Sequence, residues 1–233
     1  MTTEATYKSN MKVAHLIATD NRLLSILQRL GIRLGFGEAT VEELCTRYGI
    51  STSLFIEICN MYTFRCYNPI IGLLSENDIK SITTYLRASH KFYNEICFPE
   101  IHDKIHKLVK ELDDVSRRLI DKFYDDYDNE VNSHFKYEEE VVFPYIEAVI
   151  SNRSGNAGAY RISKFEKNHS NINEKLNDLK NIIIKYLPED VAMTLRYEIL
   201  NDIYALESDL HRHALIENKL LIPLVEKTER NNE

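Results

Sequence analysis

The feature of the sequence that most constrains the fold is a spaced set of His, Glu and Pro residues that occurs twice. Each copy has an isolated His, then a His-x-x-x-Glu pair that begins 44 residues later, then a Pro six residues after the Glu. The copies are His90, His134, Glu138 and Pro144, and His169, His213, Glu217 and Pro223. All four positions share one offset of 79 residues (169 − 90, 213 − 134, 217 − 138, 223 − 144). The chain has only 8 His and 5 Pro, so the repeat indicates two related helical hairpins.

The residue types in this repeat are those that bind transition metals. Residues four apart lie about 40° apart around an α-helix, so each His-x-x-x-Glu pair presents both side chains on one face. Imidazoles and carboxylates suit iron, manganese or zinc, and six ligands are too many for one tetrahedral zinc. The sequence therefore predicts a dinuclear site, with iron foremost, in which each Glu bridges both ions and a position stays open for an oxo or hydroxo bridge and an external ligand. The predicted ligands are His90, His134, Glu138, His169, His213 and Glu217.

The low content of helix-breaking residues favours an all-α fold. Only 7 Gly and 5 Pro interrupt a chain of 233 residues that is 44% hydrophobic. We expect an up-and-down four-helix bundle in residues 71–233, preceded by a small helical domain in residues 1–70. The expected helices are 11–30, 40–49, 52–61, 75–111 (bent near Pro99), 115–150, 160–186 and 189–226, with a linker at 63–74 and a loop at 151–158.

Helix-capping residues set several of these boundaries. Gly31 ends the first helix, and Thr40 with Glu43 forms a capping box for a short helix that Gly49 closes. Ser51 caps the following helix. Ser75, followed three residues later by an Asp, starts the first long helix.

Charge and composition argue against several classes of partner. A net charge of −7 disfavours a general grip on nucleic acid or anionic membranes. No apolar run approaches the ~20 residues of a membrane span, and residues 1–10 are polar, so we expect a cytoplasmic protein. The four cysteines, Cys45, Cys59, Cys66 and Cys97, lack the spacing of a zinc or disulfide framework and are expected to be reduced and mostly buried.

Other polar and aromatic residues near the motifs are assigned to ordinary structural roles. His15, His102, His106 and His211 have no counterparts in the repeat or face away from it. Tyr93 and Tyr137 are expected to be core aromatics. Glu139 and Glu140 are expected to form a solvent-exposed face, because the second copy has Asn218 and Lys219 there.

The two motif segments resemble the hemerythrin-like domain of the RIC family, the di-iron proteins for repair of iron centres. The segments are His134-Phe-Lys-Tyr-Glu138-Glu-Glu-Val-Val-Phe-Pro144 and His213-Ala-Leu-Ile-Glu217-Asn-Lys-Leu-Leu-Ile-Pro223, within residues 76–226. His90 and His169 fit the family's two isolated ligands. The resemblance implies a non-haem di-iron centre with Glu138 and Glu217 as bridges. It also implies repair of iron–sulfur clusters damaged by nitric oxide or peroxide, with iron donation or nitric oxide reduction as routes.

The N-terminal region resembles the small leading domain of the same family, with one departure. That domain usually has two adjacent cysteines after a Gly-Ile start, whereas residues 31–38 here contain none. A second function therefore stays open, in which the site senses oxygen or nitric oxide and the N-terminal helices signal to a partner. Oxygen or iron storage ranks third, and DNA binding by residues 40–61 is disfavoured because Arg47 is their only base. The expected partners are damaged iron–sulfur proteins, a gaseous ligand and a second copy of the chain.

Overall fold

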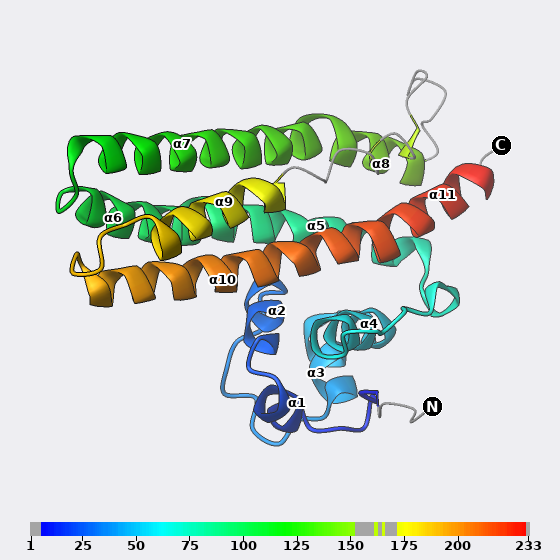
Figure 1. The fold of residues 1–233 in the computed structure, drawn as a ribbon. Coiled ribbons are helices and arrows are strands. Elements are labelled where there is room, and N and C mark those ends of the chain that lie inside the picture. Colours follow the sequence, from blue (N-terminus) through cyan, green and yellow to red (C-terminus); the bar gives the residue numbers. More distant parts are fainter. Residues whose placement is uncertain (1–5, 152–160, 163–164, 166–171, 232–233) are drawn as a thin grey trace. The chain divides into compact units, whose positions relative to one another are not determined.

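The computed structural model describes residues 6–151, 161–162, 165 and 172–231, and within these ranges the chain is mainly helical (Figure 1). The described residues contain no strand, only an isolated bridge between Lys12 and Thr40. The all-α prediction is confirmed. The chain forms two compact units: one holds Met1–Ser89, Tyr145–Ser163 and Arg212–Glu233, and the other holds His90–Pro144 and Lys164–His211.

The second unit is a four-helix bundle. Its helices are α6 (Phe98–Val109), α7 (Asp114–Tyr137), α9 (Ile172–Lys185) and α10 (Met193–Ile216) as far as His211. Short connections join α6 to α7 and α9 to α10, so the members of each pair run antiparallel (Figure 1). The expected up-and-down topology is present within this unit.

All four helices of this unit contribute to one apolar core. Buried side chains recur every three or four residues along each helix, which is the spacing of a single helical face. They include Ile101, Ile105 and Leu108 on α6, Ile120, Tyr124, Tyr127, Val131 and Phe135 on α7, Leu176, Leu179 and Ile183 on α9, and Ile199, Ile203, Leu206 and Leu210 on α10. Hydrophobic burial along these faces holds the hairpins together.

The first unit contains the N-terminal helices together with segments of the long helices. Its elements are α1 (Val13–Thr19), α2 (Leu23–Arg29), α3 (Val41–Tyr48), α4 (Thr52–Thr63), the 3₁₀ turn η1 (Ile71–Leu73), α5 (Glu76–Phe92) as far as Ser89, α8 (Phe143–Ile150) from Tyr145, and α11 (Ile222–Asn231). The predicted domain boundary at residue 70 lies inside this unit and stays a prediction. Among the described helices, none is both long and apolar enough to cross a membrane.

The capping signals read from the sequence are confirmed. Thr40 and Glu43 exchange both hydrogen bonds of a capping box, and α3 ends at Gly49 with φ of 65°. The Ser51 hydroxyl accepts from the Leu54 N–H at the start of α4. The Ser75 N–H donates to the Asp78 carboxylate at 2.7 Å, ahead of α5.

The expected helix over residues 11–30 is wrong in one respect, because it is broken at Asp20. Asp20 leaves helical geometry at φ −145° and ψ 103°, and α2 begins three residues later. Its buried carboxylate accepts from the backbone N–H of Arg22 and from the Arg22 guanidinium, at 2.6 and 2.7 Å for the latter. It also accepts from the Thr63 hydroxyl at 3.0 Å. A short polar side chain that satisfies a neighbouring backbone donor competes with continued helix.

Three of the four long helices predicted from the sequence are each interrupted by a five-residue π-helix. These are η2 (Tyr93–Cys97), η3 (Glu138–Val142) and η6 (Glu217–Leu221), and Pro99, Pro144 and Pro223 follow them after one intervening residue. A proline in a helix offers no N–H to the carbonyl four residues back, and its ring crowds that carbonyl. At each site that carbonyl belongs to the π-segment, so the wider turn accommodates the proline.

The remaining boundaries agree with expectation to within a few residues where they are described. The second long helix begins at Asp114, and the last one extends to Asn231 instead of ending near Glu226. The start expected near residue 160 and most of the loop at 151–158 lie outside the described residues.

Replacing Asp20 by Asn should lower the free energy of unfolding by about 1–3 kcal/mol, the usual range for a lost buried charge-assisted hydrogen bond. Burial would raise the pKa of Asp20, but hydrogen bonds from Arg22 and Thr63 together lower it. This contribution to stability is therefore present above the unfolded pKa of about 3.9 and is lost as the pH falls through the lower folded pKa. Chemical denaturation at about pH 7 and about pH 3 measures it.

The control for this change is Glu38→Gln. Glu38 also pairs with a cation, Lys12 at 2.5 Å, but its side chain is 80% exposed. An exposed ion pair contributes little, so this variant should unfold like the parent chain. Equal losses from the two variants would mean that Asp20 acts only through its surface charge.

Candidate metal centre

Glu138 is a fully buried carboxylate with a histidine on each oxygen. It follows the last residue of α7 and opens η3. Its Oε1 lies 2.6 Å from Nε2 of His134, and its Oε2 lies 2.8 Å from Nε2 of His90. The His134 contact follows from the helical i,i+4 spacing, because the Glu138 N–H still bonds to the His134 carbonyl.

The second His-x-x-x-Glu pair has the same local geometry. Nε2 of His213 lies 3.1 Å from Oε1 of Glu217, and the side chains are 3% and 0% exposed. Glu217 opens η6 as Glu138 opens η3. In both π-segments the residue after the segment donates its N–H to the carbonyl of this glutamate, five residues back. The backbone irregularity is thus anchored at the carboxylate residue itself.

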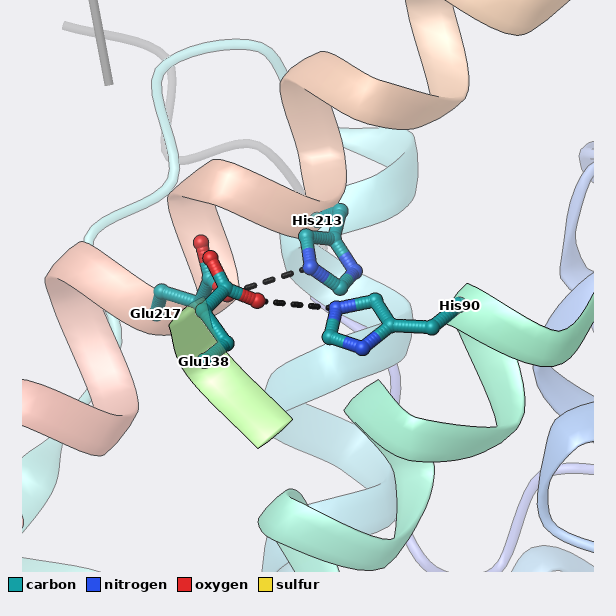
Figure 2. Close-up of side chains that lie close together, drawn as sticks. All are labelled: His90, Glu138, His213 and Glu217. Atoms are coloured by element: carbon teal, nitrogen blue, oxygen red, sulfur yellow. Dashed lines mark ion pairs between the residues drawn. The ribbon is translucent and has the colours of Figure 1, made fainter. Parts of the chain in front are cut away.

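Two imidazoles and two carboxylates gather in one group. One ligand atom from each of His90, Glu138, His213 and Glu217 lies within 4.8 Å of all the others, and all four residues are buried. Figure 2 shows the two imidazole rings directed at the two carboxylates. This is the donor set from which a metal site is built, and it is the group of this kind found among the described residues.

The other two predicted ligands, His134 and His169, are not among these four residues. His134 contacts Glu138 but is not part of the four-residue group. His169 lies outside the described residues, so its position is untested. The six-residue assignment therefore stays a prediction, of which the structure brings four residues together and attaches a fifth to one of them.

The burial of the two carboxylates fits a bound cation. A carboxylate removed from water is costly unless positive charge and hydrogen bonds offset the loss of hydration. Here imidazole Nε2 atoms lie 2.6 to 3.1 Å from the carboxylate oxygens, and imidazoles bind metals in their neutral form. Residues of this chain would therefore hold a divalent ion with charge offset by carboxylates and with nitrogen ligands supplied by His.

Aromatic side chains enclose the His90 half of this group. The His90 ring stacks on Phe135 at 4.2 Å and on Phe143 at 5.7 Å between centroids. Tyr93 is fully buried and stacks on Phe135 at 5.7 Å, in agreement with its assignment as a core aromatic. Phe165 lies parallel to the His134 ring at 6.5 Å. These rings fix the imidazole planes and limit access of water.

The interpretation of Glu139 as part of a solvent-exposed face is wrong. Its side chain is 37% exposed, but its Oε1 lies 2.9 Å from Nδ1 of His90. The repeat did not predict a role for Glu139, because the second copy carries the neutral Asn218 at the equivalent position. Glu140 does behave as expected, with a side chain that is 64% exposed.

Most of the other assignments agree with the structure where it describes them, whereas Tyr137, expected in the core, is only half-buried. His15, His102, His106 and His211 are exposed and take no part in the four-residue group. No disulfide joins the cysteines, of which Cys45 and Cys59 are buried, Cys97 is half-buried and Cys66 is exposed. Burial raises the pKa of the Cys45 thiol to about 11, which leaves it protonated and unreactive at neutral pH.

Comparison with known families identifies the class of protein to which this site belongs. Residues 81–225 match the hemerythrin HHE cation-binding domain, and this match spans all six predicted ligands. The chain belongs to that hemerythrin family. Neither the comparison with curated proteins nor that with solved structures gave a match.

Replacing His134 by Ala should lower the metal content of the purified protein, because it removes an imidazole 2.6 Å from the Glu138 carboxylate. His169→Ala should lower it similarly if the repeat assigns the ligands correctly. The measurement is elemental analysis of protein from iron-replete cells, expressed as metal per chain.

The controls are His106→Ala and His211→Ala, which remove exposed imidazoles outside the four-residue group. Both should keep the metal content of the parent chain. A similar loss from all four variants would show that the 79-residue repeat does not define the ligands.

Proposed function

We propose that the chain holds two iron ions in a non-haem centre and serves in the repair of iron–sulfur clusters damaged by nitric oxide or peroxide. The observation that supports this most directly is the Glu138 carboxylate, which presents one oxygen to each of two imidazoles at 2.6 and 2.8 Å. A carboxylate placed in this way can make one metal bond through each oxygen. Glu217 would act as its counterpart from the second hairpin.

The choice of iron and of two ions rests on the donor set and the family. Four neutral imidazoles and two carboxylates suit a pair of six-coordinate ions better than one tetrahedral zinc. Two bridging carboxylates would offset two of the four positive charges of a diferrous pair. When bound, iron would supply a coordination position that exchanges between an oxo or hydroxo bridge and an external ligand such as oxygen or nitric oxide.

The repair role comes from the resemblance of the two motif segments to the RIC family. On this proposal the chain is a cytoplasmic protein whose macromolecular partners are proteins with damaged clusters, and iron held by the two hairpins is passed to them. The protein-side requirement is a site that holds iron firmly yet exchanges it. The i,i+4 pairs provide firm binding because both ligands of each pair share one rigid helix.

A second candidate function, sensing through the N-terminal helices, is favoured by a buried network within the first unit. Arg29 of α2 donates to the hydroxyls of Tyr62 on α4 and Tyr85 on α5, at 2.9 and 3.2 Å. The two hydroxyls lie 2.7 Å apart. Arg212, which directly precedes His213, donates to the Tyr62 carbonyl at 3.1 Å and stacks over its ring. A movement of His213 would therefore shift Arg212 and alter its contacts with Tyr62.

The repair proposal predicts the outcome of removing the two carboxylates. Glu138→Ala and Glu217→Ala should each weaken metal binding by at least the 10–100-fold typical of losing a supporting group at a metal site. The double variant should hold far less than the two irons per chain expected of the parent. Because imidazoles and core remain, helix content should persist. Iron analysis, circular dichroism and recovery of a nitric-oxide-damaged iron–sulfur enzyme should be measured on the same three variants.

Two outcomes would contradict the proposal. If the double variant keeps two irons, the carboxylates are not bridges. If it loses iron but still restores the damaged enzyme, the metal centre does not perform the repair.

Tyr62→Phe separates the two candidate functions. The change removes one hydroxyl from the Arg29 network and keeps the ring under Arg212. Under the repair proposal, iron content and enzyme recovery should match the parent chain. If the chain is a sensor, nitric oxide should change the protease susceptibility of the N-terminal helices in the metal-loaded parent chain. The Tyr62→Phe variant should then bind iron normally but lose this response to nitric oxide.

A further inference from the structure

Both nitrogens of the His90 ring face carboxylates from neighbouring residues. Nε2 lies 2.8 Å from Glu138 and Nδ1 lies 2.9 Å from Glu139. Successive residues of an α-helix point about 100° apart, so they rarely contact opposite edges of one ring. Here both residues belong to η3, where the helix takes its wider turn. The π-segment thus directs two adjacent carboxylates to a single imidazole.

The two carboxylates differ in environment, which separates their roles. Glu138 is fully buried inside the four-residue group, whereas Glu139 is 37% exposed and is absent from that group. A neutral imidazole has one N–H and one bare nitrogen, and the hydrogen bond made by one nitrogen decides which state the other adopts. An ionised Glu139 accepts a hydrogen bond, so it keeps the proton on Nδ1 and leaves Nε2 free to bind a metal.

The repeat places no second carboxylate at the position equivalent to Glu139. The position equivalent to Glu139 in the second copy is Asn218 (139 + 79), which carries no charge. A carboxylate on the far nitrogen makes an imidazole a stronger donor to its metal, and an amide cannot do so to the same degree. The two copies therefore match in their predicted ligands and differ in charge at this position.

We propose that Glu139 is a positioning residue for His90, which holds its Nδ1 proton and makes the half of the centre served by His90 bind its ion more tightly than the other half. This inference rests on the metal centre proposed above. Its consequence is functional inequivalence: under competition from a chelator, the ion held by the Asn218 half leaves first and the ion bound to His90 leaves second.

The chain offers a matched control for this role. Glu140 is the next residue of the same π-segment, is 64% exposed, and lies 3.9 Å from Lys136. Glu139→Ala and Glu140→Ala each remove one carboxylate close to the centre, and only the first removes the contact with His90. Glu139→Gln keeps a hydrogen-bond acceptor of the same shape and removes the charge.

The first experiment follows the loss of iron(II) from the loaded full-length chain to a coloured iron(II) chelator without oxygen. The parent chain should lose its two ions in two phases. Glu139→Ala should speed the slower phase about 10–100-fold and bring the two phases together. The slower phase of Glu139→Gln should have a rate between those of the parent chain and Glu139→Ala. Glu140→Ala should lose its ions at the parental rates. Circular dichroism on all four proteins checks that the helices persist.

The second experiment observes the proton itself in protein loaded with zinc alone, which is diamagnetic. A slowly exchanging imidazole N–H signal that disappears on His90→Ala identifies Nδ1–H of His90. It should be present in Glu140→Ala and lost, or exchange rapidly, in Glu139→Ala. A simple loss of surface charge would not produce this difference.

The inference is overturned if Glu139→Ala loses iron at the parental rates, if Glu140→Ala accelerates the slow phase equally, or if the His90 signal survives in Glu139→Ala. These results would leave the metal centre itself intact, since the parent chain would still carry two ions. A parent chain that binds no metal would instead remove the proposed function and this inference together.

Discussion

The candidate site depends on the burial of two carboxylates in an apolar environment. Glu138 and Glu217 are fully buried, and each is approached by histidine Nε2 atoms at 2.6 to 3.1 Å. Charge hidden from water in this way is tolerated only where it is matched by positive charge and directed donors. The helical i,i+4 spacing, the aromatic rings stacked on His90 and the π-segments all place these donors. Removing the groups that balance these carboxylates would therefore disturb the geometry of the site before it disturbed the packing of the helical core.

Much of this could be predicted from the sequence, because the decisive signals are local or repeated. A capping box needs only Thr40 and Glu43, and a His-x-x-x-Glu pair on a helix brings its two side chains together whatever surrounds it. The repeat also gave long-range information, since its shared offset identified His90 as a ligand that acts together with the two His-x-x-x-Glu pairs, which are far away in sequence. The four residues that gather in the structure were all among those it selected.

What could not be predicted depends on contacts between distant residues or on geometry that the repeat hides. The Asp20 carboxylate at the helix break also accepts a hydrogen bond from the Thr63 hydroxyl, which lies 43 residues away. The contact between Glu139 and His90 spans 49 residues, and the second copy has Asn218 in place of Glu139, so comparing the copies argued against a role for Glu139. The π-segments have a signal in the sequence, a proline inside each of three long helices, but a proline alone predicts a bend and does not specify how the turn widens.

The π-segments also bear on how such a chain came to exist. η3 and η6 begin at residues separated by the same 79 positions as the ligands, so the repeat includes a backbone irregularity as well as side chains. A single hairpin of this kind carries half a donor set and would complete it by pairing with an identical chain. Fusion of two such hairpins from a symmetric dimer would produce a repeat of this form. In one continuous chain each half can accept substitutions independently of the other, and Glu139 and Asn218 are equivalent positions beside a ligand that differ in this way.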